Sequence, residues 1–515
     1  MNNKVIASTL VISGIISLAI TFFFPFGSIE NEKSQNNCLR NELIISADLN
    51  SMTLNPGKVS DAANKGLLNL IYSRLVKPEG FFNITGDLLK KWSFDRVQLQ
   101  YLLELKDNVY FQNGKLLTTE DVYFSFKEWL QGGNLDTNFL SSIEGAKQFQ
   151  EGLTSEISGI KIISSKILSV KLLFNDVNFI TNLTTPRFVI YPSNFLSLSR
   201  ENYFAKPIGS GPFSVTSIND SIILEKNNEY FKGVPLISTI KILNANDNEA
   251  TSLLESQKID LVAFNNVNTK ELPAGFIKKR VRSFKKLLLI LNQNQNHQLE
   301  NKSIRELIVN NLLDESLLEF CFPQGKKTRE IIPEGMIGHR KRVGINTNIS
   351  NNIKLEEPIT LYIENFQGAT CFADGINKKN KAANLPIVVK AEPFNVLYQL
   401  YETKKLGGWF ELLSFKNEDP YNVLQYFSPE SPEFLVGKIT PKIRDIYNII
   451  NQETNLSVRY SLYSELEDNL MNEKLVYPFL DVDDFIIYKE ELSEPFAFGA
   501  SSYIQNWHAL GSHCE

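Results

Sequence analysis

The chain has few residues of the kinds that bind metals. Four histidines and four cysteines occur among its 515 residues, and no two cysteines form a C-x-x-C pair. A zinc ribbon or a dithiol redox motif is therefore not supported. His508 and His513 have the spacing of a zinc finger's histidine pair, but the cysteine pair that should precede them is missing. We expect them to be exposed tail residues, and His297 and His339 are isolated.

The four cysteines are Cys38, Cys321, Cys371 and Cys514. Scattered buried thiols are one interpretation, and two disulfides in an oxidising compartment are the other. Four cysteines allow three connectivities, and the sequence does not choose among them. We favour Cys321–Cys371 within one lobe and Cys38–Cys514 as a tie between the two ends.

Motifs for catalysis are also lacking. No G-x-x-x-x-G-K-[ST] loop occurs, and Ser210 lies between two glycines without the G-x-S-x-G spacing of a nucleophile elbow. We interpret Ser210 as a turn residue. Asp481, Asp483 and Asp484 are close in sequence, but a solvated turn explains them better than an acid–base pair. The chain is therefore predicted to bind a ligand and not to be an enzyme.

The charge is nearly balanced, with 53 basic and 58 acidic residues and a formal net charge of -5. This excludes the electrostatic signature of a nucleic-acid-binding protein. The length predicts two to four structural units with substantial cores, at roughly 100–200 residues each. A small ligand or a protein partner fits these properties better than nucleic acid does.

The N-terminus contains an uncharged run over residues 5–26, after a single lysine. This pattern predicts an export signal or a membrane anchor within residues 1–27. No clean A-x-A cleavage site follows, so an anchor that is not removed stays an alternative. Residues 28–42 are then expected to be a tether, with the protein outside the cytoplasm, in the periplasm or on the outer face of the membrane.

The remaining sequence alternates between strand-like and helix-like patterns, which predicts a mixed α/β fold with partly parallel sheets. Apolar runs predict strands at 43–47, 97–105, 287–291 and 409–415, and helical spacing predicts helices at 62–75, 122–130, 303–320, 393–405 and 441–470. Thr118 with Asp121, and Ser303 with Glu306, have the spacing of capping boxes. In residues 207–213, two glycines would allow unusual φ angles and two prolines would fix them.

Four sequence blocks carry a resemblance to a known family. They are residues 88–92 (LLKKW), 101–105 (YLLEL), 108–114 (NVYFQNG) and 117–125 (LTTEDVYFS). Further blocks follow in the family's order, at 54–56 (LNP), 207–213 (PIGSGPF) and 227–235 (NNEYFKGVP). The chain thus resembles the peptide/nickel-binding family, family 5, of extracytoplasmic solute-binding proteins that serve ABC-type importers. The resemblance covers residues 43–320 well and thins beyond them.

The resemblance implies a two-lobed, periplasmic-binding-protein-like α/β fold with a hinge and a ligand cleft between the lobes. Lobe I would comprise residues 43–283 and 481–515, and lobe II residues 284–480. Closure about the hinge would trap a small solute, and the permease subunits in the membrane would recognise the closed form. No cofactor and no metal are expected, and we expect a monomer.

The resemblance also suggests residues that face the ligand. They are Asn55, Trp409, Phe415, Lys416 and Asp419. Peptide binders of the family resemble W-x-x-D-Y-x-D-P, and Lys416 stands where the first aspartate would meet the peptide's amino terminus. A cation there would repel an α-ammonium group and favour an anionic or N-blocked ligand. Trp409 and Phe415 could instead be core residues, Lys416 a solvated lysine, and Asp419 the start of a turn.

Two other functions stay open at this stage. One is a membrane-anchored ligand sensor or accessory binding protein that is not coupled to import. The other is an extracytoplasmic hydrolase on the same fold, which the lack of a nucleophile constellation disfavours.

Overall fold

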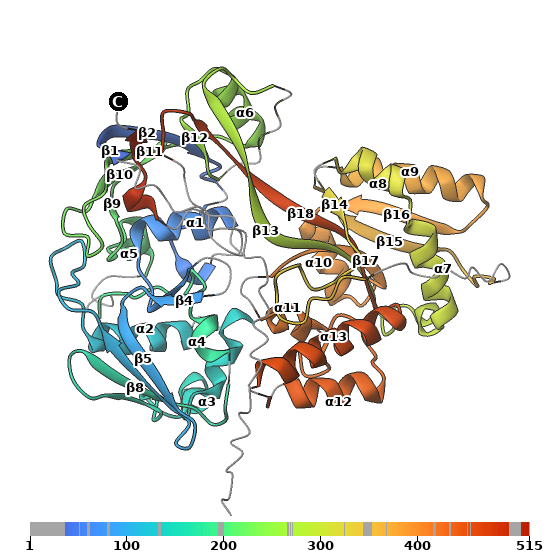
Figure 1. The fold of residues 1–515 in the computed structure, drawn as a ribbon, viewed down its shortest axis with the longest axis horizontal. Helices are drawn as coiled ribbons and strands as arrows, with labels where there is room; N and C mark the ends of the chain where they lie inside the picture. Colours follow the sequence, from blue (N-terminus) through green and yellow to red (C-terminus); the bar gives the residue numbers. More distant parts are fainter. Residues whose placement is uncertain are drawn as a thin grey trace, which may run out of the picture.

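The structure, a computed structural model, describes residues 37–513 apart from short gaps, of which the longest are 194–199, 343–352 and 494–505. Its main feature is an eleven-stranded mixed sheet that continues through both halves of the molecule (Figure 1). In spatial order its strands are β16 (Ile387–Glu392), β15 (Ile359–Glu364), β17 (Gly408–Ser414), β13 (Phe276–Leu291), β18 (Val476–Lys489), β12 (Leu261–Val262), β2 (Arg40–Ala47), β11 (Ile237–Asn244), β10 (Ser221–Lys226) and β9 (Phe213–Ile218), with β14 (Gly325–Lys327) paired to β18.

Parallel pairs occur on both sides of this sheet, β2 with β11 and β12, and β15 with β16 and β17. The smaller sheets consist of β5 (Leu89–Asp95), β6 (Gln100–Leu105), β8 (Ile167–Lys171) and β7 (Ile160–Ile162); of β3 (Val76–Glu79) and β4 (Asn83–Gly86); and of β1 (Asn37–Cys38) and β19 (Ser512–His513). The mixed α/β fold class predicted from the sequence is confirmed.

The helices of the first half lie around its sheets, and those of the second half surround β15, β16 and β17 (Figure 1). The α-helices are α1 (Ala62–Ile71), α2 (Thr119–Gln131), α3 (Ala146–Gln150), α4 (Phe179–Asn182), α5 (Arg200–Ala205), α6 (Asp247–Glu255), α7 (Lys302–Leu312), α8 (Glu315–Cys321), α9 (Ala369–Ala382), α10 (Phe394–Glu402), α11 (Tyr421–Leu424), α12 (Pro441–Ile450) and α13 (Leu456–Asn472). Short 3-10 helices are η1 (Pro56–Lys58), η2 (Leu135–Ser142), η4 (His297–Glu300), η5 (Gln425–Phe427) and η6 (Trp507–Ala509). Among the described residues, no helix is both long enough and apolar enough to span a membrane. The apolar run at 5–26 lies outside them.

Buried apolar side chains form two large cores. The first extends from Leu43 to Leu261 and includes Ile486, Tyr488 and residues near Trp507. The second extends from Phe284 to Leu480. A small third cluster lies beneath α6 and joins Leu254 to residues of β12, β13 and β18. The chain therefore builds two separate hydrophobic cores on one continuous sheet.

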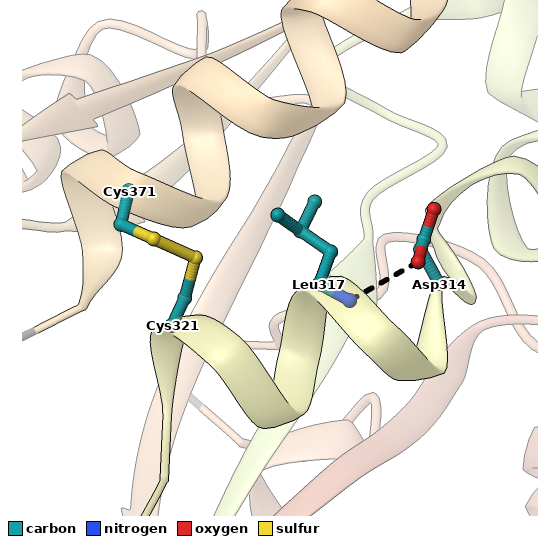
Figure 2. The surroundings of a disulfide bond; sticks show 4 residues. All are labelled: Asp314, Leu317, Cys321 and Cys371. Carbon is teal, nitrogen blue, oxygen red and sulfur yellow. Dashed lines mark hydrogen bonds between the residues drawn. A yellow bond between two sulfur atoms is a disulfide. The ribbon is translucent and has the colours of Figure 1, made fainter.

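Two predicted helices are each divided in two by a side-chain cap. The predicted helix at 303–320 ends at Leu312, and Asp314 starts α8 by accepting a hydrogen bond from Leu317 N at 3.1 Å (Figure 2). The predicted helix at 441–470 likewise divides at Asn455, which caps α13. The capping box predicted at Ser303 is wrong, because Asn301 is the N-cap residue of α7 and accepts from Ser303 N. Asparagine and aspartate oxygens satisfy the free N–H groups at these helix starts.

The capping residues predicted for α2 do lie at its start. Asp121 Oδ2 accepts hydrogen bonds from Thr118 N at 2.9 Å and from Thr118 Oγ1 at 3.2 Å. The other oxygen, Oδ1, accepts from Lys115 Nζ and from Ser193 N, both at 2.7 Å. Asp121 is fully buried, so these four donors replace its lost hydration.

Gly209 and Gly211 are needed for a reason that the sequence did not reveal. Neither has a positive φ angle. An added Cβ would lie 2.0 Å from Ile71 O at Gly209 and 2.4 Å from Ile71 C at Gly211. The segment thus passes directly against the end of α1, where Gln112 also donates to Ile71 O and to Phe213 O. Close backbone approach, and not unusual φ, explains both glycines.

A disulfide joins Cys321, the last residue of α8, to Cys371 near the start of α9 (Figure 2). This is the pairing that the sequence favoured for one lobe. Cys514 lies outside the described residues, so the second predicted pair is not tested. The backbone does bring the two ends together, because Cys38 pairs with Ser512 between β1 and β19.

Candidate ligand-binding region and hinge

Two long strands connect the two cores. β13 and β18 pair antiparallel over most of their length, and Figure 1 shows them running from one half of the molecule to the other. Phe276 of β13 and Ile486 of β18 belong to clusters of the first half, whereas Phe284–Leu291 and Val476–Leu480 belong to the second core. Motion of one half relative to the other must therefore bend this two-stranded connection.

The pairing of these strands is interrupted at one place. The register shifts between Val281 and Lys285, and Phe284 has a φ of 48°. A positive φ in a bulky residue costs free energy and occurs where the surrounding structure imposes it. Phe284 is buried, and its carbonyl accepts a hydrogen bond from Phe415 N at 3.2 Å. This bulge lies where the chain passes from the first core to the second.

Three ion pairs connect the same two strands beside the bulge. Lys285 Nζ lies 2.6 Å from Asp484 Oδ1, and Lys286 Nζ lies 2.5 Å from Asp481 Oδ1. Arg280 pairs with Asp483. The predicted solvated turn is therefore wrong: these three acids lie on β18, and each faces a cation of β13. The three acids are close in sequence because they are neighbouring residues of one strand, and not because they form a turn.

Lys286 is the most buried of these cations, with its side chain 1% exposed. Burial lowers the pKa of its ammonium group, while Asp481 acts in the opposite direction. It also donates to Thr328 Oγ1 at 2.9 Å, so two acceptors compensate its burial.

In the second half, Asp419 lies within a buried polar cluster. Its carboxylate pairs with Arg459 of α13, accepts from the Tyr463 hydroxyl, and accepts from Tyr421 N at 2.9 Å. Arg459 has a side chain 3% exposed, and it also donates to the carbonyl oxygens of Ile450 and Glu453. Burial, followed by the charge of Asp419, raises the pKa of the Tyr463 hydroxyl well above its ordinary value. Asp419 thus holds the start of α11 to α13.

An acid of the first half acts on this same cluster. Asp176, between β8 and α4, is half-buried and accepts from Asn178 N at 3.0 Å. Burial raises the pKa of Asp176 to about 6, although this hydrogen bond and the positive charge of Arg459 act in the opposite direction. Leu173 and Phe174, three and two residues before Asp176, are more than half exposed. The charge of Arg459, near the start of α13, therefore acts on Asp176 in the other half.

The structure places two of the predicted ligand-facing residues inside a core. Trp409 on β17 is 3% exposed and Phe415 is 0% exposed, and both belong to the second core. Trp409 Nε1 donates to Glu411 Oε2 at 3.0 Å. The alternative that the sequence left open, that both are core residues, agrees with these positions. Aromatic residues of strands pack well on a buried face.

The other predicted residues have different outcomes. Asn55 is half-buried, and its Oδ1 accepts from Gly57 N at 2.9 Å, which forms the turn into η1. Lys416 lies outside the described residues, so its predicted contact with the ligand is not tested. Within the described part of the chain, no group of three His, Cys, Asp or Glu side chains could hold a metal ion.

Comparisons with known proteins agree with this architecture. The sequence profile of the bacterial extracellular solute-binding proteins, family 5 Middle, matches residues 83–308. The structure of the murein tripeptide binding protein MppA of Escherichia coli superposes with a TM-score of 0.75 at 13% identity, covering 93% of this chain and 100% of that one. Residues 83–308 therefore match the family 5 solute-binding proteins in sequence, and nearly the whole chain shares the fold of MppA.

Two curated relatives match this chain over part of their length. The oligopeptide-binding protein AppA of Bacillus subtilis is 28% identical over 193 residues, 35% of this chain and 33% of AppA. The nickel-binding protein NikA of Staphylococcus aureus is 27% identical over 212 residues, 40% of this chain and 39% of NikA. The matched part is thus one third to two fifths of these relatives. The two-lobed fold that the resemblance implied is confirmed. The family whose profile matches is described as extracellular solute-binding proteins.

Sequence reasoning missed the residues that surround Asp419. Arg459 and Tyr463 are four residues apart on α13, so they lie on one face of the helix. That spacing alone would have predicted that the two side chains are neighbours. Their partner Asp419 lies 40 and 44 residues earlier in the chain, and no local pattern connects them.

Proposed function

We propose that this protein binds an oligopeptide or a related small solute outside the cytoplasm and delivers it to an ABC-type permease. The observation that carries the proposal is the match of nearly the whole chain to a murein tripeptide binding protein, together with the family 5 profile. AppA, named for oligopeptide binding, supports the same class of ligand. NikA, named for nickel binding, makes a metal complex the alternative cargo that an experiment has to distinguish.

The two cores support the predicted domain limits, with residues 43–283 and 481–515 as lobe I and residues 284–480 as lobe II. Phe284 is the first residue of the second core and Leu480 is its last. The ligand would then lie between the lobes, near Asp176 and Arg459. Closure would bend β13 and β18 at the bulge.

Two features of residues 416–420 favour a ligand without a free α-ammonium group. A lysine, Lys416, occupies the position where the resemblance implies an aspartate, and Asp419 is already engaged by Arg459 and Tyr463. An ammonium group would meet a cation at the first position and an occupied carboxylate at the second. An anionic peptide would meet a favourable charge, and an N-blocked peptide would avoid the repulsion.

Native mass spectrometry of the purified protein tests this proposal, with identification of any small molecule that dissociates from it. A co-purifying peptide supports the peptide class, and a nickel complex replaces it. The same spectrum gives the oligomeric state, which we expect to be monomeric. Lys416→Asp should shift preference toward peptides with a free amino terminus; unchanged preference would remove Lys416 from the binding site.

The apolar run at residues 5–26, without a clean cleavage site, favours a second candidate function. The protein would then stay anchored and act as a ligand sensor or accessory binding protein that is not coupled to import. Mass determination of the membrane-associated protein decides between the two N-termini. An intact N-terminus together with unimpaired solute uptake in cells that lack the protein would favour the sensor.

A further inference from the structure

Four cations of the first half gather around one buried carboxylate. Asp87, directly after β4, is 5% exposed, and Arg74, Lys77, Lys106 and Lys232 are the cations beside it. They come from four different places: the β3–β4 hairpin and the turn before it, the end of β6, and the loop after β10. The fold therefore brings together more positive than negative charge in a poorly hydrated place.

The contacts of Asp87 use only part of this charge. Its carboxylate pairs with Lys232 Nζ and accepts from the backbone N of Arg74 at 2.8 Å. Lys106 Nζ donates instead to the carbonyl oxygens of Gly86 and Asp87, at 2.9 and 2.8 Å. The Arg74 guanidinium donates to the Thr184 carbonyl. Burial raises the pKa of Asp87, but the charges of Lys232 and Arg74 outweigh it, and the result is a pKa of about 2.

Lys77 is a cation with few compensating contacts. Among the described residues its Nζ donates one hydrogen bond, to Asn506 Oδ1 at 3.2 Å. Burial and then the charge of Lys232 lower the pKa of Lys77 to about 8, against the attraction of Asp87 and the exposed Glu79. An ammonium group has three donors. In the described part of the chain Lys77 has one acceptor, Asn506, and Lys232 has one acceptor, Asp87, together with the Phe231 ring at 5.2 Å.

A histidine borders the same place. His508, predicted to be an exposed tail residue, is half-buried, and its ring packs at 5.3 Å from that of Tyr230. Its Nδ1 is buried without a hydrogen-bond partner. Burial, followed by the charges of Lys232 and Lys77, lowers the pKa of His508 to about 4, so the ring is neutral at pH 7. A neutral imidazole has one N–H donor and one acceptor nitrogen, so His508 borders this place as a polar ring without charge.

We propose that a small oxyanion, a phosphate or a carboxylate group, binds between Lys77 and Lys232 beside His508. Such a group supplies further acceptor oxygens to the two ammonium groups and reduces the repulsion between them. Hydrogen bonds between ammonium groups and oxyanions are the strong, charge-assisted kind. The site involves none of the residues assigned above to the transported ligand. Evidence for or against it is therefore independent of the proposed transport function.

The test uses the whole protein and inorganic phosphate, with acetate as the carboxylate probe and chloride at the same ionic strength as the reference. We expect phosphate or acetate to raise the Tm above its value in chloride, and isothermal titration calorimetry to detect binding. Lys77→Met keeps the apolar stem and removes the charge, and it should weaken binding about ten- to hundredfold. Lys161→Met is the matched control, because Lys161 is exposed on β7, and it should bind as the parent protein does.

Two results would overturn the proposal. One is a Tm in phosphate and in acetate equal to that in chloride, and the other is unchanged affinity in the Lys77→Met protein. If that variant folds poorly, Lys77→Gln replaces it, with circular dichroism as the check. A larger effect of phosphate than of acetate assigns the site to phosphate groups, and the reverse assigns it to carboxylates.

Discussion

Substitution of Asp419 by asparagine separates a structural role of this residue from a ligand-binding one. The substitution keeps the shape but places an amide N–H donor, or a neutral oxygen, against the guanidinium group of Arg459. That guanidinium is almost fully buried and would lose its charged partner. Breaking a buried ion pair from one side typically costs about 3–5 kcal/mol. Arg459 retains two carbonyl acceptors at 3.1 and 3.0 Å, so we expect a loss of about 2–4 kcal/mol.

Hydrogen exchange of the backbone amides of α13, followed by mass spectrometry, measures this loss locally. A loss of 2–4 kcal/mol corresponds to exchange about thirtyfold to nearly a thousandfold faster where opening is at equilibrium. Asp445→Asn is the matched control, since Asp445 is exposed on the neighbouring α12, and its exchange should match the parent protein. If Asp419→Asn abolishes ligand binding while α13 exchanges as before, the carboxylate faces the ligand and the assignment made here is wrong.

Three further predictions concern stability. Gly211→Ala should lower the free energy of unfolding by more than about 3 kcal/mol, because the new Cβ meets backbone atoms. Gly152→Ala, where there is open space and φ is +72°, should lower it by about 1 kcal/mol. Equal losses for the two variants in urea unfolding would refute the steric argument. Cys371→Ser opens a disulfide with a sequence separation of 50, and the chain-entropy estimate is about 4 kcal/mol, so an unchanged Tm would contradict a bond that stabilises the fold. Asp176→Asn should stabilise the protein at pH 7 by about 1–2 kcal/mol, because a carboxyl whose pKa rises from 3.8 to about 6 on folding opposes folding once ionised. Stability in the parent protein should gain from this group as pH falls from 6 to 4, and the variant should lose that part of the pH dependence.

The sequence predicted the elements whose residues carry their own pattern. The strand at 43–47, the helix at 62–75 and the amphipathic helix from Val122 to Leu130 all appear, with ends shifted by a few residues. The family resemblance supplied the two-lobed architecture, and the long sequence blocks that carry it lie mostly in the first half. Helix breaks were missed, because the capping residues Asp314 and Asn455 resemble ordinary polar positions within a helix.

The candidate site was predicted less well, for a physical reason. The burial of Trp409 on β17 and of Phe415 directly after it depends on which face of the strand is covered, and a single run of aromatic and apolar residues does not show that. The cluster of Asp419, Arg459 and Tyr463, and the cations around Asp87, form between segments that are far apart in the chain. Sequence spacing describes neighbours within an element, whereas these groups are neighbours only after folding.

In the proposed hinge, ion pairs between residues far apart in the chain would not oppose the bending. The pairs of Arg280, Lys285 and Lys286 with Asp483, Asp484 and Asp481 all join β13 to β18. They connect the two strands of the hinge and not the two lobes, so bending both strands together requires none of these pairs to break. In the proposed closure, bending would be easiest at the bulge, where Phe284 already has a positive φ and the ladder is already interrupted. Salt weakens the partly exposed ion pairs between β13 and β18, but it does not act on the backbone bulge. Raising the ionic strength should therefore lower the stability of the two-stranded connection more than it changes the place where the connection bends.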